Sequence, residues 1–468
     1  IEYETRPNSA AFLDAPTDAT AAQSNIDFFH IHGAHSAIGA WFEERGARQQ
    51  HVALKLFVAL FERVKVIWYE APAEVESTAM FARLNVGRIP LTDAELLKAL
   101  LLGGGGIEDK RQEDKHREVA AQWDAIEYAL HDEDFWAFVT NAEADEYPAR
   151  IELLFALLAP DDPVAHRERY QTFYKLQRRV EANRSAFWAE VLALFAQLRE
   201  WYEDRNLYHK VGFLIAEGES LRALLDEAHD KPRSAFRSSL DARIQKRLAL
   251  TEDDLIDLRY DTDHKRCERV LTLANVEAVR ALSESTERYP FRAHKRARWS
   301  LEHIHAQHAE GLTKKAQWDA WLTAHRDALD ALPMDGSERT KLQLRITEAL
   351  STLTHETFEA LVEEVSAHFH RSDGQQDDDL HGLGNLALLD GTHNSALNNA
   401  AFEVKRQRIL ALDKAGAYIP LCTRRVFLKY FTAADAQQVH FWSPQDRAAW
   451  LDAVAAILKP YLSPETSP

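Results

Sequence analysis

The sequence predicts an α+β protein that is predominantly helical, and two observations lead to this fold class. The middle of the chain carries apolar residues at three- and four-residue spacing, as in Trp188, Val191, Phe195 and Leu198, which is the spacing of an amphipathic helix. One short segment, Val64–Tyr69, is a possible strand, and Asn385 lies in another short apolar segment. Strands are therefore expected to be few and short.

Length and composition exclude several classes of protein. A chain of 468 residues has room for two to four domains at ~150 residues each. Its 46% hydrophobic and 28% charged residues exclude a disordered chain, a collagen-like repeat and a disulfide-stapled miniprotein. The two cysteines are far apart, which favours a reducing cytoplasmic compartment and inert, buried thiols. No apolar run approaches the ~18 residues that would span a membrane.

Local signals predict where helices begin and end. Thr92 with Glu95 three residues later is a capping box, and glycines 103–106 follow the helix that it starts. Helices are also expected over Lys314–Leu332, over Glu338–His370, and after Ser443 and Pro444. These signals divide the chain into a mixed part at 1–106, a helical connector at 107–258 and a C-terminal domain at 259–468.

A set of polar residues in the last part has the chemistry for phosphodiester hydrolysis. That reaction needs an activated water, a group that takes its proton and a cation that offsets the charge on the phosphate. Glu302 and His303, Asn385, and His393 with Asn394 supply histidine, carboxylate and amide groups of the required kinds. A lone Glu-His pair, however, more often belongs to a surface helix or contains a histidine that is buried in the core.

The order of these residues resembles the ββα-metal fold of the HNH nucleases. The resemblance implies that His303 is the general base, that Asn385 orients it, and that Glu302 and Asn394 bind Mg²⁺ or Mn²⁺. His393 is an alternative ligand. This sequence departs from compact HNH motifs because His303 and Asn385 are 82 positions apart, and we expect a helical insertion at 311–380 to fill that gap.

Longer segments resemble the C-terminal nuclease domain of the GmrSD-type family. They are the stretches 299–307, 383–390, 394–406 and 419–430. Proteins of this family join the nuclease to an N-terminal ParB/sulfiredoxin-like domain, and they include type IV, modification-dependent restriction enzymes and related anti-phage nucleases. The segment 81–92 is similar to the Asn-x-x-Gly-x-Pro-Leu-Thr signature of that N-terminal domain and contains Asn85 and Gly87.

One expected motif is missing from the N-terminal part. The family carries an Asp-Gly-Gln-Gln-Arg motif tied to nucleotide binding, which would lie before Ile1. The sequence therefore predicts a partial domain in which Asn85 and Gly87 form an incomplete nucleotide site. A nucleoside triphosphate is expected to bind only if the missing segment is supplied, for instance by a partner polypeptide.

Basic residues cluster on both sides of these nuclease segments. Lys295, Arg296 and Arg298 precede the first segment, and Lys405 and Arg406 follow Asn394. Each cluster is either a solvated face or a DNA contact. The balance of 56 basic against 74 acidic residues, a net charge of −18, argues against non-specific coating of nucleic acid but leaves a local basic groove open.

The sequence thus predicts a cytoplasmic, metal-dependent DNA endonuclease of the HNH type. The resemblance implies phage defence by type IV restriction, with modified phage DNA as a substrate and the N-terminal half as regulator. No membrane partner is expected, and a homo-oligomer stays open. Two alternatives remain: a non-catalytic DNA-binding or regulatory module, and a nucleotide-hydrolysing sensor.

Overall fold

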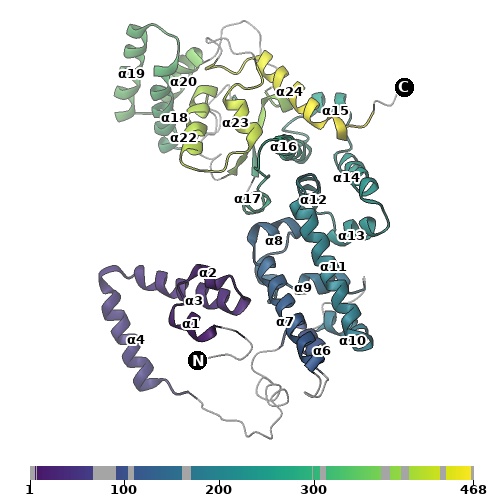
Figure 1. The fold of residues 1–468 in the computed structure, drawn as a ribbon. Coiled ribbons are helices and arrows are strands. Elements are labelled where there is room, and N and C mark those ends of the chain that lie inside the picture. The colour runs from purple at the N-terminus through teal and green to yellow at the C-terminus, as the bar shows by residue number, and fades with distance from the viewer. Residues whose placement is uncertain are drawn as a thin grey trace. The chain divides into compact units, whose positions relative to one another are not determined.

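The structure is a computed structural model that describes residues 6, 8–66, 91–103, 110–160, 170–297, 299–305, 312–369, 380–391, 400–432 and 439–464. Two compact units are present: Ile1–Trp136 with Ala142–Glu200, and Ala137–Asn141 with Trp201–Pro468. Helices dominate, and the described strands form one two-stranded sheet (Figure 1). The predicted fold class, α+β and predominantly helical, is confirmed. Five predicted site residues lie outside the described residues: Asn85, Gly87, Arg298, His393 and Asn394.

The described elements of the first unit are all helical. The segment Val64–Tyr69, predicted as a strand, has no regular structure at 64–66 and lies outside the described residues beyond that point. The helices that lie wholly in this unit are α1 (Ser9–Asp14), α2 (Ala19–Ala22), α3 (Ile26–Glu43), α4 (Gln49–Arg63), α6 (Asp93–Leu102), α7 (Lys110–Leu130), α9 (Glu152–Leu158) and α10 (Gln171–Ala182). Two further helices, α8 (Glu133–Val139) and α11 (Arg184–Glu203), contain the boundaries between the two units.

Local sequence signals in this unit act as expected. The side chain of Thr92 accepts a hydrogen bond from the backbone of Glu95, and the Glu95 carboxylate accepts one from the Thr92 backbone, which completes the predicted capping box of α6. The periodic apolar residues of α11 face the core, where Val191 and Leu198 are fully buried. A stacked pair, Trp123 from α7 and Trp188 from α11, joins two of these helices.

The second unit contains the sheet and the remaining helices. The helices before the sheet are α12 (Arg205–Ala216), α13 (Leu221–His229), α14 (Arg233–Leu248), α15 (Glu252–Asp257), α16 (His264–Arg280) and α17 (Phe291–Arg296). The sheet pairs β1 (Trp299–His303) with β2 (Leu386–Asp390), and the later helices are α18 (Lys315–Ala328), α19 (Gly336–Ser351), α20 (His355–Phe369), α22 (Phe402–Lys414), α23 (Leu421–Phe427) and α24 (Pro444–Leu458).

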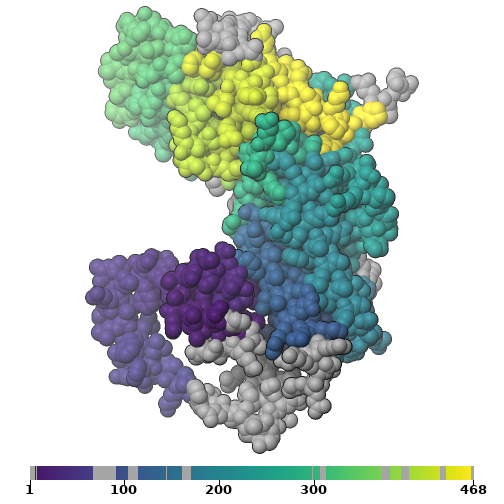
Figure 2. Space-filling view, viewed as in Figure 1, coloured from purple at the N-terminus to yellow at the C-terminus, as the bar shows by residue number. Residues whose placement is uncertain are grey.

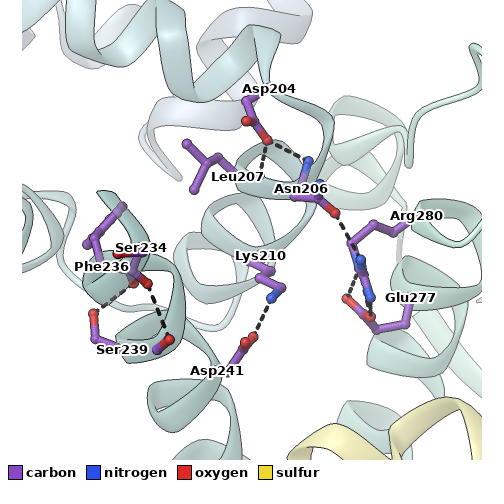
Figure 3. A network of polar contacts seen from close by, with 11 residues as sticks. Asp204, Asn206, Leu207, Lys210, Ser234, Phe236, Ser239, Asp241, Glu277 and Arg280 are labelled. Atoms are coloured by element: carbon purple, nitrogen blue, oxygen red, sulfur yellow. Dashed lines mark hydrogen bonds and ion pairs between the residues drawn. The ribbon is translucent and has the colours of Figure 1, made fainter. Parts of the chain in front are cut away.

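Polar contacts fix the frame of α12, α14 and α16 (Figure 3). Asp204 caps α12 by accepting hydrogen bonds from two backbone amides of its first turn. The Asn206 side chain accepts from Arg280 of α16 at 2.9 Å, and Lys210 lies 2.5 Å from Asp241 of α14. Three helices that are distant in sequence are therefore held together at one place.

The segment between the two strands forms a helical layer of its own. Helices α18, α19 and α20 lie side by side, in green in Figure 1, and share a core that includes Leu322, Ile346 and Val365. They fall within the predicted insertion 311–380. His325 of α18 accepts a hydrogen bond through Nε2 from the backbone of Ala401, the residue before α22, at 3.2 Å. The insertion is thereby attached to the helix that follows the sheet.

Helices shield the small sheet from water. Leu386, Leu388 and Leu389 of β2 are fully buried, and α16 packs against both strands. Thr423 of α23 and Trp450 of α24 donate hydrogen bonds to the carbonyls of Leu388 and Leu386. Side chains thus satisfy backbone groups that a two-stranded sheet would otherwise leave without partners at its edge.

Candidate active site

The antiparallel register brings the predicted site residues together at one end of the sheet. Glu302 faces Ala387 and His303 faces Leu386, so Asn385 lies directly before the residue that pairs with His303. The backbone amide of Ile304 donates to the carbonyl of Asn385 at 2.8 Å. Strand pairing therefore closes the 82-residue separation between His303 and Asn385, while the intervening helices pack elsewhere in the second unit.

Asn385 fixes the backbone that follows His303. Its side chain is fully buried, its amide oxygen accepts from the amide of His305 at 3.1 Å, and its amide nitrogen donates to the carbonyls of His305 and Leu380 at 3.0 and 2.9 Å. None of these contacts reaches the imidazole of His303. Asn385 therefore acts on His303 through the main chain, by setting the path of the segment in which the strand ends.

Glu302 and Lys405 form a buried ion pair. The Lys405 ammonium lies 2.5 Å from Glu302 Oε1 and also donates to the carbonyl of His303 at 2.5 Å. The two residues are 4% and 1% exposed. Lys405 therefore ties α22 to the end of β1, and in this conformation its ammonium is shielded from solvent.

His303 is half-buried and uncharged at neutral pH. Burial is the main reason that its pKa is lowered to about 4, with smaller contributions from the positive charge of Lys405 and from His381. A neutral imidazole keeps one N–H and has a lone pair on its other ring nitrogen, so it can accept a proton from water. The structure thus keeps His303 in the state that a general base requires.

Two residues that the sequence reading did not single out surround His303. His381 Nδ1 lies 3.2 Å from His303 Nε2, within hydrogen-bond range. The ring of Tyr260 lies 4.6 Å from the His303 ring, measured between centroids, and the Tyr260 backbone donates to the His381 carbonyl at 2.8 Å. His381 directly precedes the Gly-Leu-Gly-Asn segment, but nothing in its local pattern marks a partner 78 positions away.

The described residues do not complete a metal site. Among them, no group of three or more His, Cys, Asp or Glu side chains is arranged to hold a metal ion. Glu302 is described, but Oε1 of its carboxylate is engaged by the Lys405 ammonium, which already neutralises its charge. The other two predicted ligands, His393 and Asn394, fall outside the described residues. The metal dependence of the site therefore stays a prediction.

The predicted DNA-contacting residues differ in their surroundings. Lys295 is mostly buried, donates to the carbonyls of Ala137 and Thr140, and has a pKa lowered to about 7 by burial. Arg406 bonds to Glu403 on its own helix at 3.3 Å, whereas Arg296 is exposed. Among the described members of the basic set, Arg296 therefore has the position that suits a phosphate contact.

Comparison with known families identifies part of this unit. Residues 363–426 match the family model of the GmrSD restriction endonucleases, C-terminal domain. This part of the chain is of the GmrSD type. The match contains β2, Asn385 and Lys405, and it supports a restriction endonuclease role. Comparison with curated proteins and with solved structures returned no match.

The GmrSD-type match begins after β1, so it contains Asn385 but not His303. The register of the two strands joins His303 to the matched region. The resemblance of 81–92 to a ParB-like signature lies outside the match and stays a prediction. No described helix is long and apolar enough to cross a membrane.

Proposed function

We propose that this chain is an HNH-type DNA endonuclease in which His303 is the general base. One observation carries the proposal: an uncharged histidine ends a strand that pairs with the strand of a GmrSD-type domain. His303 would remove a proton from the water that attacks the phosphate, a contribution worth roughly 10²- to 10⁴-fold in rate.

The surrounding residues would position this base. With the Nε2 proton of His303 donated to His381, the Nδ1 lone pair is left to accept the proton from water. Lys405 holds the carbonyl of His303 itself, and Asn385 holds the backbone of His305, two residues further along the chain. Mg²⁺ or Mn²⁺, bound with the help of His393 and Asn394, would offset the negative charge that develops on the phosphate oxygens.

The biological role that we propose follows the family resemblance. The chain would act in the cytoplasm against phage DNA, with a preference for modified DNA, and its N-terminal half would regulate cleavage. The N-terminal part, with Asn85 and Gly87, would bind a nucleoside triphosphate only together with a segment that carries the Asp-Gly-Gln-Gln-Arg motif. DNA is the expected partner.

A non-catalytic DNA-binding module is the second candidate, and one observation favours it. The ammonium of Lys405 contacts Glu302, the described carboxylate that the nuclease reading assigns to a metal ion. If this ion pair persists in the active protein, Glu302 serves the structure alone. A binding-only protein would then retain DNA binding without any cleavage.

The deciding experiment is cleavage of supercoiled plasmid and of hypermodified phage DNA, with Mg²⁺ or with EDTA. His303→Ala should abolish metal-dependent cleavage, because the attacking water would lose the group that accepts its proton. The matched control is His355→Ala, which removes an exposed histidine of α20 in the same unit and should cleave like wild type. DNA binding without cleavage in wild type, under every metal condition, would favour the second candidate. A difference between the cleavage rates of the two DNAs would show whether the protein recognises the modification.

A further inference from the structure

Helix α4 presents an apolar face to solvent. It has 15 residues, and none of them is buried. Leu54, Phe57 and Phe61 are 62%, 59% and 79% exposed, and Leu56, Val58 and Leu60 are also exposed. In Figure 2 the violet surface contains α4 together with the end of α3. Burial of such a surface is strongly favourable, so a face of this size marks an interaction site.

The geometry of the helix shows which side lies away from the other described residues. Val52 and Ala59 are the two half-buried residues, and because they are seven positions apart they lie on one side of the helix. Leu54, Phe57 and Phe61 are spaced by three and four residues and lie roughly opposite to that side. The apolar stripe therefore points away from the residues that α4 contacts.

Charge and spacing identify the partner as a second copy of this chain. Lys55 and Glu62, also seven positions apart, share one flank of the stripe. When two copies of α4 pair antiparallel about a two-fold axis, Phe57 faces Phe61 of the other copy and Lys55 comes beside Glu62 of the other copy. The register that places Phe57 opposite Phe61 and the register that places Lys55 opposite Glu62 differ by only one residue. In a parallel pair, the flank that carries Lys55 and Glu62 would instead meet the opposite flank of the other copy, and that opposite flank carries no acidic residue.

We propose that α4 is a dimerisation helix that pairs antiparallel with α4 of a second copy. The stripe would bury the exposed parts of four phenylalanines, together with those of leucine and valine side chains, which approaches the ~1,200 Å² of a small stable interface. This inference does not depend on the nuclease proposal, because it concerns the first unit and is read out without cleavage.

Sedimentation of the full chain over a range of concentrations tests the proposal. Wild type should form a dimer, and Phe57→Glu should give monomers, because it places two carboxylates in the apolar seam. The matched control is Leu344→Glu, which changes an exposed leucine of α19 with 57% exposure and should leave the dimer intact. Circular dichroism confirms that each variant is folded. A monomeric wild type, or a dimer that survives Phe57→Glu, would overturn the inference.

A charge swap separates self-pairing from other occupants of the face. Lys55→Glu should weaken the dimer at least about tenfold, because the new carboxylate at position 55 would face Glu62 of the other copy at two places. The double variant Lys55→Glu, Glu62→Lys should restore the wild-type dissociation constant, since the two charges exchange roles across the axis. If a different protein or another segment of this chain covered the face, exchange of the two charges would not restore the wild-type dissociation constant. Failure of the double variant to recover would therefore rule out the antiparallel pair.

Discussion

Lys405 and Glu302, 103 positions apart, form a buried ion pair whose ammonium also holds the main chain of the candidate base, His303. One lysine on α22 thus connects the helix after the sheet with the end of the strand before it. Its position explains how a site can be assembled from segments on both sides of a long insertion. Burial lowers the pKa of His303, and the Lys405 ammonium lowers it further.

Replacement of Lys405 by methionine should destabilise the protein strongly. Glu302 would remain as a buried carboxylate without its cation, which typically costs about 3–5 kcal/mol in the free energy of unfolding. The double variant Lys405→Met, Glu302→Gln should recover much of that loss, because no buried charge remains. Urea denaturation of the variants measures both effects.

The control for this ion pair is another pair of the same unit at the surface. Arg345 lies 2.5 Å from Glu364, and the two side chains are 57% and 35% exposed. Arg345→Met should cost less than about 1 kcal/mol, since exposed pairs contribute little. If Lys405→Met costs no more than Arg345→Met, the buried pair does not stabilise the site.

Removal of His381 should move the pH dependence of cleavage. His381 helps to lower the pKa of His303, so His381→Ala should raise that pKa. A general base is lost when it is protonated, and a higher pKa moves the loss of activity to higher pH. The rate of His381→Ala should therefore fall between pH 7 and pH 5, where wild type keeps its rate. A profile that overlays that of wild type, as expected for the His355→Ala control, would show that His381 does not tune the base.

Gly384→Ala should disturb Asn385 because the glycine lies against α24. A Cβ atom at Gly384 would lie 2.8 Å from the carbonyl oxygen of Arg447, and a backbone atom cannot move aside easily. We expect a loss of about 1–3 kcal/mol in the free energy of unfolding, as for other overpacked positions, and slower cleavage. Gly336→Ala is the control, since nothing lies within 4 Å of its new Cβ. Equal stability of the two variants would contradict the close contact.

The features that could be predicted from the sequence depend on single residues or on residues that lie within a few positions of one another in the chain. The capping boxes that begin with Thr92 and Ser443 are formed, and both cysteines are buried with a pKa raised to about 12. These features follow from spacings of three or four residues and from low polarity.

The contacts that were not predictable join distant segments. The bond between His303 and His381 depends on where the segment before β2 lies, and the Glu302 to Lys405 pair depends on how α22 packs. No local pattern encodes either contact, since strand register and helix packing bring the residues together. The apolar face of α4 is a further case, because its periodicity alone is that of a helix packed into a core.

His209 should make the stability of the second unit depend on pH. The residue is fully buried on α12, its Nδ1 donates to the carbonyl of Arg205 at 2.7 Å, and its Nε2 accepts from the backbone amide of Tyr289 at 3.1 Å. This pattern requires the neutral imidazole, because a protonated Nε2 could not accept. Burial accordingly lowers the pKa of His209 to about 4, whereas an unfolded chain would have a value near 6.5.

The sign of this dependence follows from proton binding. Between pH 6.5 and pH 4 the unfolded chain holds a proton on His209 that the folded chain lacks, so the free energy of unfolding falls as the pH falls through this window. The full effect is about 3 kcal/mol, and it is absent above pH 6.5 because both states are then neutral. His209→Gln should be less stable than wild type at pH 7 and should lose less stability between pH 7 and pH 4. His229→Gln, at an exposed position on α13, should keep the wild-type slope, and an unchanged slope in His209→Gln would assign the acid sensitivity to other histidines.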